Sequence, residues 1–202
     1  MDYKSILSKR IGIKVIREII NETQGNAENI NELYKLLFDN DDITAYQAAW
    51  VMCHFSKEDN EWLFKKQKEL IDEVLVCSHT GKRRLILCLL EKQPLENNPP
   101  RLDFLDFCME RMFKMTEPPG IQTLCIKIAY YLCSAISELL NEFIQTLELI
   151  EPELLPPSLK CVRSNLLDKY SRRQNFGYAQ LPKLRLRSVT LNLKPETLNF
   201  KP

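Results

Sequence analysis

The sequence predicts an all-α fold: a short right-handed α-solenoid of about four helix pairs, with an N-terminal capping helix and an extended C-terminal tail. Apolar helix-like segments alternate with short polar turns, and the second helix of each pair is expected to begin near Thr44, Lys82, Gly120 and Pro157. These starts are 37 to 38 residues apart, and such a fixed period is typical of stacked helix pairs. Only 5 of the 202 residues are glycine, and strand-like alternation is scarce before residue 180. The body is therefore expected to be nearly all helical.

The first predicted helix covers residues 5–21. Its isoleucines recur at gaps of three to five positions, which is helical spacing. Ser5 is a suitable N-cap residue. Because a terminal repeat needs one polar face, this helix is expected to cap the array.

Four helix pairs are predicted to follow. The acidic turn from Asp39 to Asp42 suits the start of a second helix, because carboxylates favour the positive end of the helix dipole. The loop from Pro94 to Pro100 marks the clearest internal boundary, since helices tend to stop before proline. The predicted pairs are 29–38 with 43–55, 60–76 with 82–92, 102–115 with 120–133, and 137–150 with 157–170.

The charges are distributed unevenly along the chain. From Lys160 to the C-terminus there are ten basic residues and two acidic ones, a net charge of +8, so the rest carries −7 against a total of +1. Such asymmetry is typical of an interaction tail or of an internal electrostatic contact. We therefore divide the chain into a helical repeat domain, residues 1–170, and a basic extended tail, residues 171–202.

The cysteines indicate a reducing environment. There are seven, an odd number, no CxxC motif occurs, and nearly all lie in apolar helical segments, where free cysteine behaves as a small hydrophobic residue. The first residues, Met1 to Lys4, lack the layout of a secretory signal. No segment approaches the ~18 apolar residues of a membrane span. A cytoplasmic protein without membrane contact is expected.

This pattern of spaced leucines, acidic turn and small residues resembles HEAT-type repeats. The first pair matches best, with leucines at 33, 36 and 37, the acidic turn, and Ala48-Ala49 in the second helix. The resemblance covers residues 29–170 and implies an armadillo-type helical repeat. Gln47 departs from it by occupying a position where a basic residue is common, and Pro118-Pro119 replaces the acidic turn of the third pair.

Motifs for catalysis and cofactor binding are scarce. The glycines are isolated, which excludes phosphate-loop and dinucleotide-binding patterns. Cys53-His54 and Cys77-Ser78-His79 could contribute to a zinc site or to a cysteine nucleophile, but packed thiols and capping or exposed histidines are the favoured interpretation. No catalytic residue, metal or cofactor is predicted.

One sharper hypothesis comes from the resemblance to HEAT-like DNA alkylation repair glycosylases. In that family, tryptophans and an acid lie near the damaged nucleotide on a basic concave face. Here the resemblance implies aromatic contacts from Trp50 and Trp62, with Asp41 or Asp42 as the acid. The acidic body disfavours nucleic acid, because binding to phosphates depends on Lys and Arg, and Trp50 has a simpler interpretation as a core residue.

Two basic segments are candidate partner-binding sites. Lys82, Arg83 and Arg84 lie at a predicted helix start, where positive charge opposes the helix dipole and an anionic partner could compensate; a solvated basic turn is the plainer interpretation. In the tail, apolar and polar residues alternate from residue 184 to 193, as in an extended strand. That strand could dock on the acidic body, bind a partner's sheet edge, or be disordered. The basic tail residues proposed for binding are Arg172, Arg173, Lys183, Arg185 and Arg187.

The function expected from these features is that of a non-enzymatic scaffold or adaptor that binds a protein partner through the solenoid surface and the basic tail. The alternative is a DNA-binding or DNA repair protein that resembles the HEAT-like glycosylases. Fold alone does not separate the two, because one fold hosts many functions.

Overall fold

The structure, a computed structural model, describes residues 1–95 and 101–179, and side chains as far as residue 174. Every described regular element is helical, which confirms the predicted all-α class. The chain divides into two compact units, Met1–Asp168 and Lys169–Pro202. The helices are α1 Tyr3–Leu7, α2 Ile13–Thr23, α3 Ala27–Leu36, α4 Asp42–Met52, α5 Lys57–Phe64, α6 Gln67–Val76, α7 Thr80–Glu91, α8 Leu102–Arg111, α9 Pro119–Cys133, α10 Ser137–Glu148 and α11 Pro157–Ala179, with a 3₁₀ turn at Pro152–Leu154.

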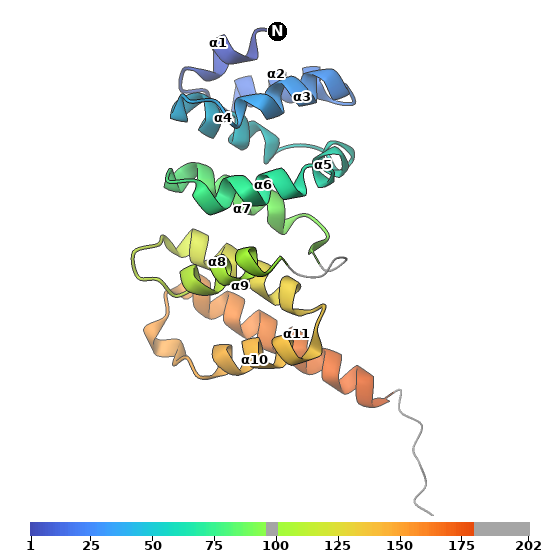
Figure 1. The fold of residues 1–202 in the computed structure, drawn as a ribbon, viewed down its shortest axis with the longest axis vertical. Coiled ribbons are helices and arrows are strands. Elements are labelled where there is room, and N and C mark those ends of the chain that lie inside the picture. The colour runs from blue at the N-terminus through green and yellow to red at the C-terminus, as the bar shows by residue number, and fades with distance from the viewer. Residues whose placement is uncertain (96–100, 180–202) are drawn as a thin grey trace, which may run out of the picture. The chain divides into compact units, whose positions relative to one another are not determined.

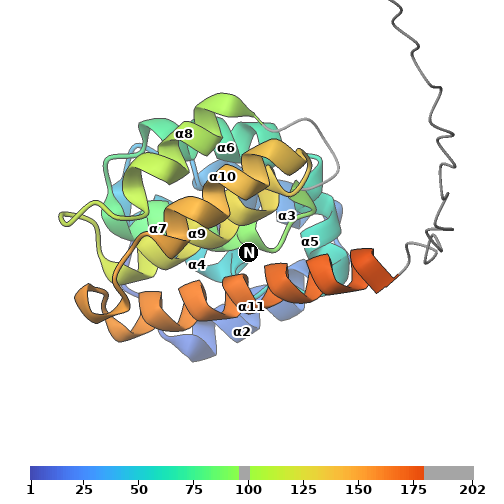
Figure 2. The ribbon, with the colours of Figure 1, turned by 90° about the horizontal axis from the view of Figure 1, so that it is seen from below.

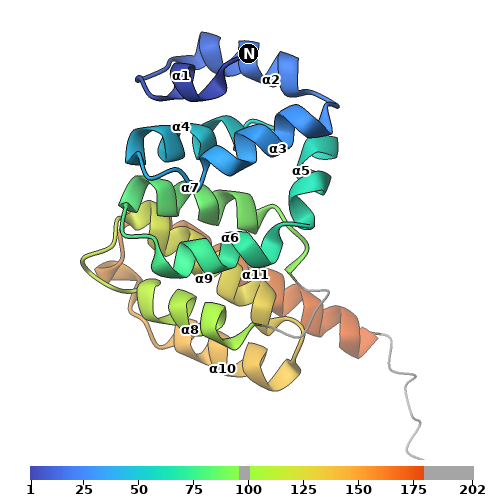
Figure 3. The same cartoon turned by 45° about the horizontal axis from the view of Figure 1, so that its top comes forward.

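Within Met1–Asp168 the helices stack as successive pairs. Figures 1 and 3 show α3 with α4, α6 with α7, and α8 with α9 as consecutive layers, with α1 and α2 at one end. Each second helix packs on the next, α4 on α7 and α7 on α9, and the first helices α6 and α8 also pack together. Figure 2, which looks along the stack, shows α6 and α8 on one side of α7 and α9. The result is the short α-solenoid that the period predicts.

The starts of the second helices keep the predicted period. Helices α4, α7, α9 and α11 begin at Asp42, Thr80, Pro119 and Pro157, steps of 38, 39 and 38 residues. The caps explain the first two starts: Asp41 Oδ2 accepts the N–H of Thr44 at 3.0 Å, and His79 Nδ1 accepts the N–H of Lys82 at 3.0 Å. Pro119 is the first residue of α9, where the missing N–H of proline costs nothing.

Two predicted helices are each divided in the structure. The segment predicted as one helix over 5–21 forms α1 and α2, with Gly12 as the N-cap of α2. Ser5 was wrongly predicted as an N-cap: it lies inside α1, and its N–H donates to the capping Asp2 at 3.1 Å. The segment 60–76 likewise forms α5 and α6, because Lys65 and Lys66 close α5 with tight backbone turns to Trp62 and Leu63.

The core runs continuously through the layers. Ala45, Ala48 and Ala49 of α4 are fully buried, and their small side chains let α4 approach its neighbours closely. Tyr130 on α9 and Phe143 on α10 are also buried and meet edge to face, with ring centroids 6.4 Å apart. Burial of such apolar side chains is the main stabilising contribution for a repeat fold, because each pair has too little core of its own.

Basic side chains from the next part of the chain donate hydrogen bonds to backbone carbonyls at the C-terminal ends of three helices. Lys92 Nζ donates to the carbonyl of Cys53, the C-cap of α4, at 2.8 Å, and Arg83 Nη2 donates to the carbonyl of Cys77, the C-cap of α6, at 2.8 Å. Arg163 Nε donates to the carbonyl of Leu147 in the last turn of α10 at 2.7 Å. These cations satisfy carbonyls that a helix end leaves without a partner.

The last helix extends further than predicted. Helix α11 continues to Ala179, so the residues from Ser171 to Ala179 are helical and not extended. No proline occurs between Ser171 and Ala179, since the next one is Pro182. The segment also contains Arg, Gln and Ala, which are good helix formers. The predicted strand over 184–193 lies outside the described residues, and the division of the chain at residue 170 stays a prediction.

Candidate partner-binding surface

Helices α4, α7 and α9 pack in succession, and we call the surface formed by their exposed and half-buried side chains the second-helix face. Cys53 Sγ of α4's C-cap donates to the carbonyl of Leu85 on α7 at 3.6 Å. Lys127 on α9 pairs with Glu91 on α7 at 3.2 Å. Arg84 on α7 lies over Gly120 of α9, where an added Cβ would be 3.6 Å from Arg84 Cδ. These contacts hold the three helices side by side.

A pocket of about 710 Å³ lies at the α4 end of this face, and we call it the α4 pocket. Asp42, Tyr46 and Trp50 are four residues apart on α4, so they project from one side of the helix. The loop between α1 and α2 and the residue before α7 complete the walls. The lining residues are Arg10, Ile11, Gly12, Asp42, Ile43, Tyr46, Gln47, Trp50 and His79.

Polar groups in the α4 pocket lack partners within the described part of the chain. Gln47 is only 3% exposed, and its Oε1 is buried without a hydrogen bond. Asp42 and Arg10 are exposed at the rim, and neither forms a hydrogen bond or an ion pair with a described residue. Since buried acceptors are nearly always paired, the Gln47 amide marks the pocket as a place where a donor is expected.

The wall formed by Tyr46 depends on a glycine. A Cβ added at Gly81, in the first turn of α7, would lie 2.9 Å from Tyr46 Cε2 and 3.1 Å from His79 Cε1. The Tyr46 and His79 rings are 5.8 Å apart. Gly81 therefore allows the tyrosine ring to pack directly over the start of α7.

The predicted basic cluster at residues 82–84 is not one surface site. Lys82 pairs with Glu73 at 2.7 Å and keeps only 8% of its side chain exposed. Arg83 pairs with Glu117 at 2.7 Å and is 11% exposed. Arg84 alone is exposed, on the second-helix face, and forms no hydrogen bond or ion pair with a described residue. The sequence could not reveal this because the acidic partners come from α6 and from the turn before α9.

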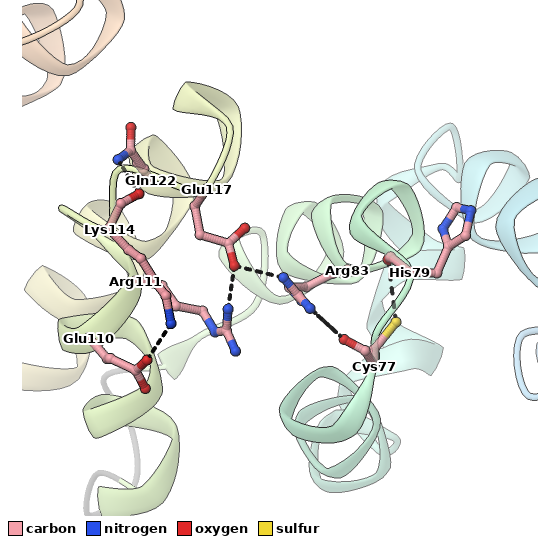
Figure 4. Close-up of polar contacts among 8 residues, drawn as sticks. All are labelled: Cys77, His79, Arg83, Glu110, Arg111, Lys114, Glu117 and Gln122. Atoms are coloured by element: carbon pink, nitrogen blue, oxygen red, sulfur yellow. Dashed lines mark hydrogen bonds and ion pairs between the residues drawn. The ribbon is translucent and has the colours of Figure 1, made fainter.

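Arg83 belongs to a buried arrangement that we call the Arg–Glu seam, formed by Arg83, Arg111 and Glu117. Figure 4 shows Glu117 accepting from both guanidinium groups, with Arg83 reaching back to the carbonyl of Cys77. Glu117 has 6% of its side chain exposed. The Arg111 guanidinium also lies 4.5 Å from the centre of the Phe107 ring. The seam ties α7 to α8 and to the turn before α9.

The two tryptophans lie in different environments. Trp50 is half-buried in the α4 pocket and packs edge-on against His54 at 6.3 Å. Trp62 is half-buried on α5 and packs against Tyr34 at 5.6 Å. Of the predicted acids, Asp42 lines the pocket with Trp50, whereas Asp41 caps α4. The predicted aromatic pair is thus separated, and Tyr46 is the pocket's second aromatic residue. The spacing of Asp42, Tyr46 and Trp50 is the sequence signal that could have identified it.

The thiols of Cys53 and Cys77 hydrogen-bond to backbone carbonyls, those of Leu85 and His79. Burial raises the pKa of the Cys53 thiol to about 12 and also raises that of Cys88. His54 Nδ1 contacts the carbonyl of Trp50 at 2.9 Å, and His79 Nδ1 is occupied in capping α7. Across the described residues, no three His, Cys, Asp or Glu side chains gather as metal ligands do.

The predicted tail residues divide between described and undescribed segments. Arg172 and Arg173 are exposed on α11. Lys183, Arg185 and Arg187 lie outside the described residues. Their binding roles stay predictions.

The stacked pairs and their surface of second helices define an α-helical repeat protein. A family model, the HEAT repeat domain, matches residues 3–170. The chain therefore belongs to the HEAT repeat domain family, which confirms the resemblance seen in the first pair. No curated protein and no solved structure matches the chain. Within the described residues, no helix has the length and apolar character needed to span a membrane.

Proposed function

We propose that this protein is a non-enzymatic scaffold or adaptor that holds a protein partner on the second-helix face. The observation that carries the proposal is the residue types gathered there. Trp50 and Tyr46 on α4 are half-buried, Tyr131 on α9 is half-buried, and Arg84 on α7 is exposed. Trp, Tyr and Arg are the residues that contribute most to binding at protein interfaces. Membership in a repeat family with extended binding surfaces supports the same function.

A comparison of matched surface variants tests this proposal. One variant carries Trp50→Ala, Arg84→Ala and Tyr131→Ala on the second-helix face. The control carries Val76→Ser, Met115→Ser and Leu154→Ser, which alter apolar residues that are 78%, 95% and 76% exposed elsewhere. Both should retain helical circular dichroism and cooperative melting.

Affinity purification from native lysate with quantitative mass spectrometry then compares the partners. We expect partners recovered by wild type and by the control to be lost by the second-helix variant. Equal recovery by both variants would contradict the proposal.

The basic tail is the second part of the proposed binding surface. A chain that ends at Ala179 removes Lys183, Arg185 and Arg187 but keeps all of α11. We expect it to recover less of the partner than the full chain does, because the cations of the tail would contact acidic groups on that partner. Unchanged recovery would remove the tail from the proposal and leave the second-helix face as its basis.

DNA binding is the second candidate, and one observation favours it: Trp50 and Asp42 share the α4 pocket. In that case an aromatic platform and an acid would receive an extruded base. An electrophoretic mobility assay at two salt concentrations tests it. Salt-sensitive binding at micromolar protein would favour the nucleic-acid function, because release of counterions makes such binding weaken with salt. Absence of DNA binding at both salt concentrations would exclude the DNA-binding function.

We also infer that the protein works in a reducing compartment such as the cytoplasm. All seven cysteines are free thiols, and four of them are buried. Free buried thiols persist where disulfides are kept reduced. Fractionation of cells that produce the tagged protein checks this location.

A further inference from the structure

We propose that the α4 pocket binds a cationic side chain of the partner, an arginine in preference to a lysine. This inference rests on the proposed function, since it names the chemistry by which one end of the second-helix face recognises its partner. It is argued from the acceptors and aromatic rings that line the pocket.

The first argument is the unpaired acceptor. Gln47 Oε1 is buried without a hydrogen bond in a side chain that is 3% exposed, and the residue lines the pocket. An unsatisfied buried acceptor costs stability unless a donor enters. A guanidinium carries five N–H donors in a rigid fork, so it can supply that donor and still reach a second acceptor.

The second argument is the rim carboxylate. Asp42 is exposed at the mouth of the pocket, and it forms no ion pair with a described residue. It lies on the same side of α4 as Tyr46 and Trp50. A cation entering between the rings would therefore meet a carboxylate at the entrance.

The third argument is the aromatic wall. Tyr46 and Trp50 are both half-buried, so part of each side chain faces the pocket. Tyr and Trp faces attract cations, and the planar guanidinium also stacks on them. An acceptor, a carboxylate and aromatic rings each favour a cationic side chain, and the residues that line the pocket include all three.

The charge of the chain up to residue 159 also favours a cationic ligand, whereas Arg10 at the rim of the pocket opposes one. Up to residue 159 the chain holds 25 acidic and 18 basic residues, so its charge attracts a basic partner. Arg10 lies at the rim of the pocket and opposes a cation. The opposition makes Arg10 a useful probe, because its removal should strengthen cation binding and weaken the binding of an anion.

The probes are N-acetyl-arginine amide, N-acetyl-lysine amide, N-acetyl-leucine amide and N-acetyl-glutamate amide, titrated into the full-length protein. The readout is the indole N–H signal of Trp50 in nitrogen-15 NMR spectra, and Trp62→Phe assigns it by removing the other indole. We expect saturable shifts with the arginine probe at Kd near ~1 mM, the range for a ligand of this size. The lysine probe should bind more weakly than the arginine probe. The leucine and glutamate probes should give no saturable shift of the Trp50 indole signal.

Two rim variants provide opposite expected results. Asp42→Asn should lower the affinity for the arginine probe about two- to fivefold. Arg10→Gln should raise that affinity by a similar factor, as expected for exposed charge pairs. Both residues are exposed, so the melting temperature should stay within error of wild type.

Three results would overturn the inference. They are a leucine probe that binds as tightly as arginine, the absence of saturable binding by any cationic probe, and arginine affinity that is unchanged in both rim variants. The first would make the pocket an apolar anchor site. The second would mean that a bound water, and not a cationic side chain, donates to the Gln47 acceptor.

Failure of this inference can be distinguished from failure of the proposed function. If no cationic probe binds but the Trp50, Arg84 and Tyr131 variant still loses its partners, the scaffold function stands and the pocket chemistry is wrong. If the arginine probe binds but that variant keeps its partners, the pocket chemistry stands and the second-helix face is not the partner surface.

Discussion

The Arg–Glu seam and the α4 pocket handle polar groups in opposite ways. In the seam, Glu117 is buried and accepts from the guanidinium groups of Arg83 and Arg111. In the pocket, Gln47 is equally buried, but its acceptor has no partner, and the rim charges of Asp42 and Arg10 are unpaired among the described residues. Buried polar groups that are satisfied hold a fold together, whereas unsatisfied ones indicate binding or strain. The comparison separates polar residues that join repeats from polar residues that have no partner among the described residues.

The largest effect is expected in the seam, from Glu117→Gln. Removing this charge leaves two guanidinium groups without their carboxylate in a buried setting, which costs about 3–5 kcal/mol of unfolding free energy. Urea denaturation followed by circular dichroism measures it.

Glu110→Gln is the matched control for that experiment. Glu110 pairs with Lys114 at 2.8 Å in the same helical region but is 62% exposed, so its loss should leave the denaturation midpoint almost unchanged. Similar losses in the two variants would show that the seam does not join the repeats as described.

A smaller effect is expected from Gly81→Ala, at the wall of the pocket. The new methyl would meet Tyr46 at 2.9 Å, so the half-exposed ring must move. We expect a stability change within about 1 kcal/mol, since overpacking opposes the better helix propensity of alanine. The arginine probe should bind several-fold more weakly.

Melting temperature and probe titration check this substitution together. Arg84 is not among the atoms that a Cβ at Gly81 would meet, and Arg84→Ala serves as a control in the same helix. Unchanged affinity in the glycine variant would exclude Tyr46 from the cation site.

Gln47→Leu should separate stability from binding. Replacing a buried unpaired amide with an apolar side chain of similar size is neutral or stabilising, here by up to about 1 kcal/mol. The same change removes the acceptor proposed for the arginine side chain. We expect an equal or higher denaturation midpoint with weaker probe binding. A clear loss of stability would mean that the Gln47 amide already has a partner.

The smallest effect concerns two thiols, that of Cys53 at the C-cap of α4 and that of Cys77, whose carbonyl accepts from Arg83 of the seam. Burial raises both pKa values, that of Cys53 from 9.0 to about 12. The folded protein therefore keeps Cys53 protonated as the pH rises past 9.0, whereas the unfolded chain ionises there, so the stability contributed by this thiol falls progressively between pH 9.0 and about 12. Iodoacetamide should label the exposed Cys161 first at pH 8, and Cys161→Ser should remove that fast phase. Fast labelling of Cys53 at pH 9 would contradict this.

The repeat architecture could be predicted from the sequence because each helix start is determined by residues close to it in the chain. The period placed the second-helix starts within two residues, since each start depends on a nearby cap or proline, as at Asp41 and Pro119. The divided helices were missed for a related reason. The stretch from Lys65 to Glu69 is polar but contains no glycine or proline, so the sequence alone does not end a helix there, and the backbone turns to Trp62 and Leu63 reveal the break.

The candidate site was less predictable, because partners distant in sequence decide which residues are exposed. Lys82, Arg83 and Arg84 look alike in the sequence, but Glu73 and Glu117 bury two of them. Trp50, which the sequence suggested as an aromatic contact, lines the α4 pocket, and its binding role stays a prediction. Its association with Arg10 and His79 required the loop after α1 and the turn before α7 to come together.

The cations that close helix ends have a consequence for how a partner arrives. Lys92, Arg83 and Arg163 each donate to a carbonyl at the C-terminal end of a helix, where the dipole supplies about half a negative charge. Their field in solution is therefore partly cancelled, while exposed carboxylates in the middle of helices, such as Glu18 on α2 and Glu142 on α10, keep theirs. Long-range steering follows this residual field, so a basic partner should associate faster at low ionic strength, while dissociation changes little.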